Sequence, residues 1–110
     1  YWQSLRESLA SLGDKSTTEV PTLLVRVGDL VLISSPTELF CQVGMAIKKH
    51  VPAPLKSAII GYSGGYVGYL PTREAMLEGG YEAEISPFAP DTADEYVQAI
   101  GKELEAWLKA

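Results

Sequence analysis

The apolar residues of this 110-residue chain change their spacing several times, and each spacing predicts a different element. Early in the chain they recur every three or four positions, at Trp2, Leu5, Leu9 and Leu12. This spacing predicts an amphipathic helix that ends at residues 13–14. Two β-rich runs follow, at residues 21–27 and 30–34. Only a Gly-Asp pair at 28–29 joins them, which predicts a hairpin. The second run is apolar throughout, as in a central strand covered on both faces.

The middle of the chain predicts a helix, a strand and a loop. A helix follows the hairpin, with Ser35 or Thr37 as its N-cap and with Leu39, Val43 and Ile47 on one face. Prolines at positions 52 and 54 end it. Residues 56–62 then predict a short buried strand, and a glycine-rich loop follows them.

The last third of the chain predicts two more helices. Pro71 opens a short helix that the glycines at 79 and 80 close, and residues 81–88 are extended or irregular. Asp91 or Thr92 caps a final helix with a buried stripe formed by Tyr96, Ile100, Leu104, Trp107 and Leu108. The order of elements predicts an α/β fold of mixed layers, in which the hairpin and a further strand form a mixed sheet covered by helices. We expect residues 1–110 to be a single segment of a larger domain.

Composition narrows the function classes. With 46% hydrophobic and 21% charged residues the chain has the composition of a globular protein, and a net charge of −5 argues against a nucleic-acid partner. The small basic group of Lys48, Lys49 and His50 is typical of a solvated helix end. The single cysteine, Cys41, excludes an internal disulfide, and no apolar run is long enough for a transmembrane segment. The chain starts without Met or a signal pattern, so we expect a piece of a longer protein.

Glu38 is the first candidate for chemistry. It follows an apolar strand and falls in the predicted first turn of a helix. Strand ends are where α/β proteins commonly build their sites. The alternative is purely structural, because a glutamate in a first turn also complements the helix dipole.

The second candidate is the loop at residues 61–69, which contains four glycines and three tyrosines. Glycine lets the backbone approach a ligand, and tyrosine combines an apolar ring with a polar hydroxyl; simple aromatic packing is the alternative. The loop also matches Gly-x-Ser-x-Gly, but no helix follows Ser63 at once and the only histidine, His50, precedes it, which argues against a serine hydrolase. With one histidine and one cysteine, the chain offers no self-contained zinc site of the usual kind.

Four short motifs follow one another along the chain: Pro-Thr-Glu-Leu-Phe at 36–40, Tyr-Val-Gly-Tyr at 66–69, Thr-Arg-Glu at 72–74 and Tyr-Glu at 81–82. In this order and at this spacing, the four motifs resemble the neutral/alkaline ceramidase family. That family runs from a strand into a Pro-Gly-Glu-Phe turn, then through a helix and a strand into Asn-x-Tyr-x-x-Tyr, a Thr-Arg-Glu-Glu helix start and a Tyr-Glu pair. The similarity covers residues 23–88, and the final helix falls where the family's catalytic domain ends.

The resemblance implies a zinc-dependent amide hydrolase acting on an N-acyl amide such as ceramide. In that family two histidines from earlier in the chain, the turn glutamate and the second tyrosine hold zinc, and the last two fall on Glu38 and Tyr69. Tyr66 matches the first tyrosine and Arg73 the arginine of the helix start, so the implied catalytic residues are Tyr69, Tyr66 and Arg73. The zinc would activate a water for attack on the amide carbonyl, releasing fatty acid and amine.

The chain departs from the family pattern at three positions. Thr37 replaces a glycine, Leu39 a phenylalanine and Gly64 an asparagine, which leaves both candidate ligands intact and the substrate open. Because the two histidines are absent, we expect the remainder of the parent catalytic domain as partner, a small-molecule or lipid amide as substrate, and no activity from this chain alone. A secreted or periplasmic location would follow if the protein is like the family.

The rival interpretation is a non-catalytic α/β binding or structural module that keeps the family fold. Two structural expectations follow from the leading interpretation. Glu38 and Tyr69 should lie near each other, although 31 positions separate them. The chain should also expose apolar surface or pair with another polypeptide, because a segment of a domain lacks some of its neighbours.

Overall fold

The computed structural model describes residues 18–109, and the expected first helix lies outside them. In chain order the elements are β1 (Leu24–Val27), β2 (Leu30–Ser34), β3 (Thr37–Leu39), α2 (Cys41–Lys48), β4 (Lys56–Ile60), β5 (Gly68–Leu70), α3 (Arg73–Glu78), α4 (Tyr81–Ile85) and α5 (Thr92–Lys109). In this part of the chain, no helix is both long enough and apolar enough to cross a membrane.

The main sheet has three strands in the order β1-β2-β4. β1 and β2 form the expected antiparallel hairpin, with Val25 opposite Leu32, and Gly28 supplies a positive φ of 59° in the turn. β4 runs parallel to β2, with Ile33 opposite Ile59. The predicted α/β class, with a hairpin and a further strand in a mixed sheet, is therefore confirmed.

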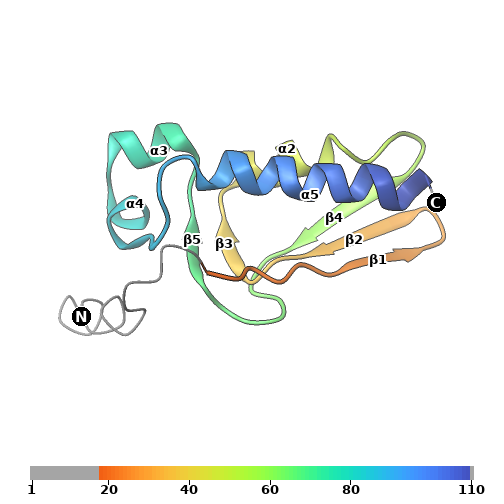
Figure 1. Ribbon diagram of the computed structural model, residues 1–110, viewed down its shortest axis with the longest axis horizontal. Helices are drawn as coiled ribbons and strands as arrows, with labels where there is room; N and C mark the ends of the chain where they lie inside the picture. Colours follow the sequence, from red (N-terminus) through yellow and green to blue (C-terminus); the bar gives the residue numbers. More distant parts are fainter. Residues whose placement is uncertain (1–17, 110) are drawn as a thin grey trace.

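The core lies between this sheet and two helices. α2 and α5 pack against each other, and α2 packs on β4 (Figure 1). The fully or nearly fully buried apolar side chains come from β2, β5, α2 and α5: Val31, Ile33, Leu70, Val43, Ile47, Ala93 and Leu104. Trp107 was expected in the buried stripe of α5 but is exposed, because Leu108 continues the buried face from Leu104 and Trp107 falls to its side.

Two local predictions are wrong. Residues Thr37–Leu39 form strand β3, paired parallel with β5, so that α2 begins only at Cys41. Thr37 does not cap a helix; its buried hydroxyl lies 2.8 Å from the hydroxyl of Ser35. Residues Tyr81–Ile85, expected to be irregular, form the short helix α4, because glutamate and alanine in this run favour a helical turn.

The sheet face opposite the two helices is apolar and open. Side chains alternate between the two faces of a strand, so this face carries every second residue of β1, β2 and β4. Four of its apolar residues are more than a third exposed, namely Val25, Val27, Leu30 and Ile60, and so is Leu23, which directly precedes β1. The prediction that the chain exposes apolar surface is confirmed by this face.

Candidate functional site

The pairing of β3 with β5 brings Glu38 and Tyr69 together. The two residues are direct partners in the parallel register, and paired residues of adjacent strands project to the same face. The predicted proximity is thus confirmed. Their setting differs from the prediction, since each lies within a strand instead of following one. Because Glu38 is not in a helical turn, the helix-dipole explanation does not apply to it.

Backbone hydrogen bonds fix this register by joining the turn before β3, at residues 35–36, to the end of β4 and the glycine-rich loop before β5. β3 follows β2 after a two-residue turn, and β5 follows β4 after the glycine-rich loop; β2 and β4 are themselves parallel neighbours. Between the two pairs of strands, the Ser35 amide donates to the Ile60 carbonyl at 2.9 Å and the Ser63 amide donates to the Ser35 carbonyl at 2.9 Å. The Val67 amide donates to the Pro36 carbonyl at 2.8 Å. The glycine-rich loop is therefore tied to the turn that precedes Glu38.

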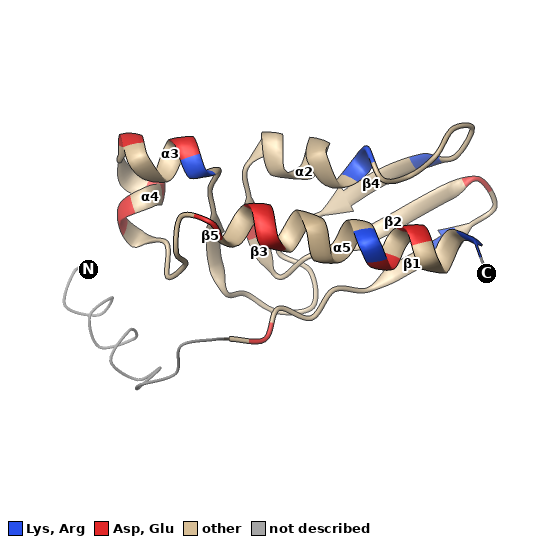
Figure 2. Ribbon diagram, turned by 45° about the horizontal axis from the view of Figure 1, so that its top comes forward, with Lys and Arg blue, Asp and Glu red and all other residues tan. Residues whose placement is uncertain are grey.

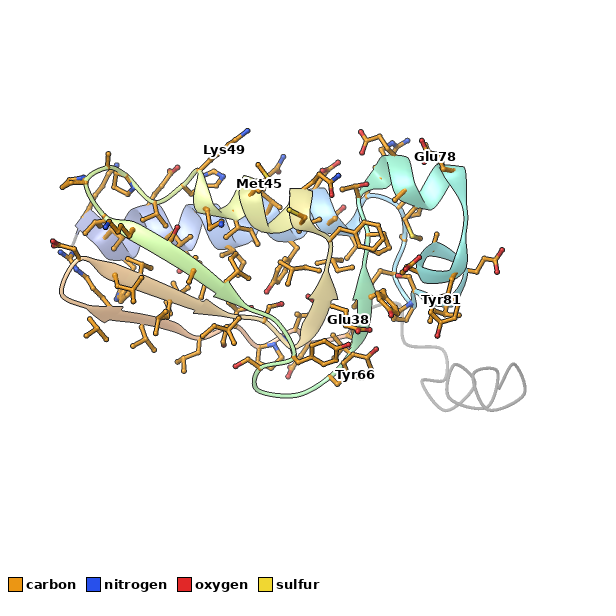
Figure 3. All side chains as sticks on the ribbon, turned by 180° about the vertical axis from the view of Figure 1, so that it is seen from behind. Glu38, Met45, Lys49, Tyr66, Glu78 and Tyr81 are labelled. Carbon is orange, nitrogen blue, oxygen red and sulfur yellow. The ribbon has the colours of Figure 1, made fainter. Side chains whose placement is uncertain are left out.

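Tyr66 reaches Glu38 from the glycine-rich loop. Its hydroxyl donates to Glu38 Oε2 at 2.6 Å, and Figure 3 shows the two side chains pointing toward each other. The ring of Tyr62 stacks on that of Tyr66, with centroids 5.5 Å apart and planes inclined by 6°. Three of the predicted site residues, Glu38, Tyr66 and Tyr69, thus form one cluster.

The surroundings of Tyr69 are acidic and partly closed. Partial burial, and after it the charge of Glu38, raise the pKa of Tyr69 above its usual 10.0, with smaller contributions from Tyr81, Glu82 and a hydrogen bond to Glu38. Tyr81 packs edge-on against the Tyr69 ring at 6.1 Å. Further acidic residues gather on α3 and α4, beyond β5 (Figure 2). This negative environment favours a neutral phenol and would attract a cation.

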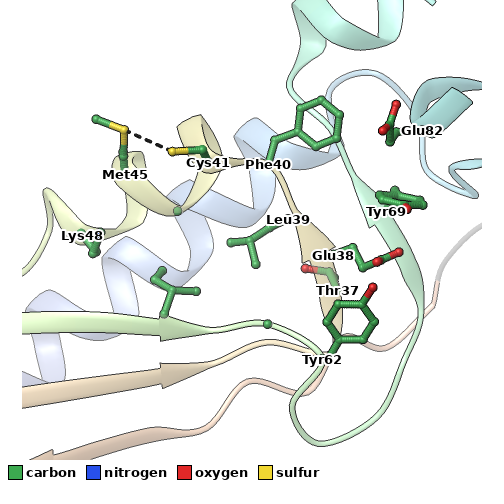
Figure 4. A pocket seen from close by; sticks show the side chains of 13 residues that line it. Thr37, Glu38, Leu39, Phe40, Cys41, Met45, Lys48, Tyr62, Tyr69 and Glu82 are labelled. Atoms are coloured by element: carbon green, nitrogen blue, oxygen red, sulfur yellow. Dashed lines mark hydrogen bonds between the residues drawn. The ribbon is translucent and has the colours of Figure 1, made fainter. Parts of the chain in front are cut away.

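An open groove of about 450 Å³ adjoins the cluster. Figure 4 shows Glu38, Tyr62, Tyr69 and Glu82 on one side of it, with α2 on the other. Its apolar lining comes from β3, α2, β4 and the residue that joins β3 to α2: Leu39, Phe40, Met45 and Ile59. The groove therefore presents polar oxygens beside an apolar wall.

The structure does not bring Arg73 into this cluster. Its guanidinium forms an ion pair with Asp91, and it does not line the groove. His50 Nδ1 lies 2.9 Å from a carboxylate oxygen of Glu105, which joins the end of α2 to α5. Among residues 18–109, no group of three or more His, Cys, Asp or Glu side chains could hold a metal ion.

Two members of the site were not named as site residues: Tyr62 was predicted only as one tyrosine of the candidate loop, and Glu82 only as part of a motif. Tyr62 and Glu82 both line the groove. The Tyr-Glu pair at 81–82 was noticed as part of the resemblance, and that pattern could have marked Glu82. Nothing in the local sequence indicated that Tyr62 would stack on Tyr66, because the contact depends on the path of the loop.

Comparisons with known proteins lead to one family of enzymes. The neutral ceramidase of Pseudomonas aeruginosa is 30% identical over 107 residues, covering 87% of this chain and 16% of the relative. Neutral ceramidase B of Dictyostelium discoideum is 29% identical, covering 76% of this chain and 12% of the relative. The neutral ceramidase of Mycobacterium tuberculosis is 29% identical, covering 79% of this chain and 14% of the relative. No protein-family model matches the chain.

Solved structures agree with the sequence relatives. The crystal structure of the Pseudomonas aeruginosa neutral ceramidase superimposes with a TM-score of 0.75 at 25% identity, over 96% of this chain and 19% of that one. A ceramidase complexed with C2 gives a TM-score of 0.70 at 25% identity, over 80% of this chain and 15% of that one. The resemblance to neutral ceramidases is confirmed. The chain spans less than a fifth of the length of these proteins.

Proposed function

We propose that this chain, a homologue of a segment of neutral ceramidases, is part of a zinc-dependent amide hydrolase and supplies Glu38 and Tyr69 to its metal site. The observation that carries the proposal is the parallel register that makes these two residues direct partners. Their oxygens share one face of β3 and β5, beside an apolar groove. Two histidines from elsewhere in the protein would complete the ligand set.

The two side chains fit a zinc ion by their chemistry. A carboxylate oxygen is a normal zinc ligand, and a phenol can join when a nearby cation favours its phenolate. In the structure partial burial, and after it the charge of Glu38, raise the pKa of Tyr69, and a dication beside both oxygens would offset the charge effect. When bound, the zinc would supply the Lewis acidity that activates water and polarises an amide carbonyl.

The chain's own residues would orient the ligand and the substrate. Tyr66 holds one oxygen of Glu38 by its 2.6 Å hydrogen bond, as the outer partners of metal ligands commonly do. The phenolic oxygen of Tyr69, which the strand register sets beside Glu38, would bind the metal next to the reacting carbonyl. Arg73 would have to leave Asp91 to reach the substrate. The apolar lining of the groove suits the hydrocarbon part of a lipid amide.

The open face of the main sheet supports a role within a larger protein. Neighbouring strands leave Val27, Leu30 and Ile60 exposed on one side. Contiguous apolar surface of this kind is usually covered by another part of a protein. The remainder of the parent catalytic domain would cover it and would bring the histidines.

The test uses the full-length protein that contains this chain. Glu38→Gln should lower zinc content and hydrolysis of a fluorescent N-acyl amide together, because a neutral amide is a weaker ligand for zinc than a carboxylate. Tyr69→Phe should lower kcat more than zinc content, because a fourth ligand adds little affinity to a site that already has three. Glu84→Gln on α4 is the matched control, since Glu84 is exposed and does not line the groove.

Zinc binding by the 110-residue chain alone distinguishes a two-part site, whose other ligands come from the rest of the protein, from a site that this chain forms by itself. Calorimetric titration of zinc into this chain should show no tight binding, because two ligands are too few. Tight one-to-one binding that disappears in Glu38→Gln would overturn the two-part site. A full-length protein that holds no zinc and cleaves no N-acyl amide would instead support a non-catalytic module with the same fold.

A further inference from the structure

We infer that Tyr62 is a positioning residue of this site, whose ring holds the Tyr66 hydroxyl against Glu38 and forms the adjoining wall of the groove. The three side chains form a sequence of contacts. Tyr62 stacks on Tyr66 at 5.5 Å, and Tyr66 donates to Glu38 at 2.6 Å. The catalytic part of this inference rests on the proposed function, whereas the geometric part stands on its own.

The backbone of Tyr62 is in a conformation that disfavours a side chain. Its φ of 54° is the single positive value at a non-glycine position among the described residues. The same loop uses glycine for its other positive φ angles, at Gly64, Gly65 and Gly68. A β-carbon in this region raises the energy of the backbone, and such strain in proteins is concentrated at functional sites. The ring of Tyr62 is the feature that a glycine could not supply.

That ring contributes little to the core. Tyr62 is 66% exposed, so folding gains little from its burial. Its ring contacts Tyr66 and lines the groove, and its amide donates to the Thr37 carbonyl at 3.3 Å. These contacts connect Tyr62 to the strand that carries Glu38. They serve the site more than they serve the stability of the fold.

Tyr66 is exposed as well, so the stacked ring adds to the contacts that hold it at Glu38. With 58% of its surface in solvent, its ring has few buried neighbours to oppose a turn about χ1. A parallel ring on one side restricts that rotation. Stacked aromatic pairs favour the paired state by a factor of about three to ten, which sets the size of the expected effect.

Two substitutions distinguish the effect of the Tyr62 ring from the effect of its positive φ. Tyr62→Gly removes the ring and relieves the positive φ, whereas Tyr62→Phe keeps both. Nuclear Overhauser contacts between the Tyr66 ring and Glu38 in the 110-residue chain should persist in Tyr62→Phe and weaken three- to ten-fold in Tyr62→Gly. The thermal unfolding midpoint of Tyr62→Gly should equal or exceed that of the wild type.

The full-length protein then gives the catalytic readout. Tyr62→Gly should lower kcat for an N-acyl amide about three- to ten-fold with a smaller change in KM, and Tyr62→Phe should restore the rate. A Tyr62→Gly variant that keeps the Tyr66–Glu38 contact, or that unfolds at markedly lower temperature, would overturn the inference. If the wild-type protein cleaves no amide, the proposed function fails, and the nuclear Overhauser contacts still decide whether Tyr62 positions Tyr66.

Discussion

Removing one hydroxyl from α5, by Tyr96→Phe, should destabilise the turn that leads into β3. The Tyr96 hydroxyl donates to Ser35 Oγ at 3.0 Å, and Ser35 Oγ lies 2.8 Å from Thr37 Oγ1. Thr22 Oγ1 also lies 2.5 Å from the Tyr96 hydroxyl. Ser35 is 1% exposed and Thr37 fully buried, so water cannot readily replace a lost partner.

The expected loss in the free energy of unfolding is about 1–2 kcal/mol. A hydrogen bond contributes about 1 kcal/mol net, and a buried polar group left without a partner costs about 1–3 kcal/mol. Ser35 keeps Thr37 as a partner, which holds the cost of Tyr96→Phe near the lower end. Urea unfolding of the 110-residue chain, followed by circular dichroism, should show a lower midpoint with an unchanged m value.

Tyr62→Phe is the matched control for this change. It removes the same atom from a tyrosine that is 66% exposed, and so it should change the free energy of unfolding by less than about 0.5 kcal/mol. A Tyr96→Phe variant with the wild-type midpoint would show that the hydroxyl chain does not stabilise the turn. Equal losses in the two variants would show that burial does not set the cost.

Two further predictions concern the helix pair and the site. Gly101→Ala should lower the free energy of unfolding by about 1–3 kcal/mol, because the new β-carbon would lie 2.6 Å from the His50 ring. The control in thermal unfolding is Gly44→Ala, whose new β-carbon would have its nearest neighbour at 3.7 Å. Equal stability of the two variants would contradict this reasoning. In zinc-free buffer the pKa of Tyr69 should exceed 10.0 and fall in Glu38→Gln, as read from the tyrosinate absorbance lost in Tyr69→Phe. The Tyr69 phenol then keeps its proton to a higher pH in the folded state than in the unfolded chain. The stability that this phenol contributes is therefore present below pH 10 and is lost as pH rises through the folded-state pKa. A Tyr69 pKa at or below its usual value would refute the predicted rise, and a Tyr69 pKa that is unchanged in Glu38→Gln would refute the charge effect.

The parts of the fold that depend on local signals could be predicted from the sequence. The strand Leu30–Ser34 was predicted with the bounds it has, because an apolar run follows a two-residue glycine turn. The final helix, which is 18 residues long, was predicted because its apolar residues recur at helical spacing from Tyr96 to Leu108. The prediction for the segment around Thr37 was wrong because its structure depends on a distant partner and not on a local signal. Its residues resemble a helix start, and the partner that makes them a strand, β5, comes some 30 positions later.

The predicted proximity of Glu38 and Tyr69 was correct despite this error, because the strand register determines which side chains meet. A one-residue slip between β3 and β5 would turn Glu38 to the face opposite Tyr69. No residue type at 38 or 69 prevents such a slip. It is prevented by backbone bonds outside the two strands, such as that from Val67 to the Pro36 carbonyl, which hold the glycine-rich loop against the turn. The resemblance could therefore predict that the two residues meet, whereas the contacts around them, Tyr62 included, follow from a loop path that pattern and composition do not determine.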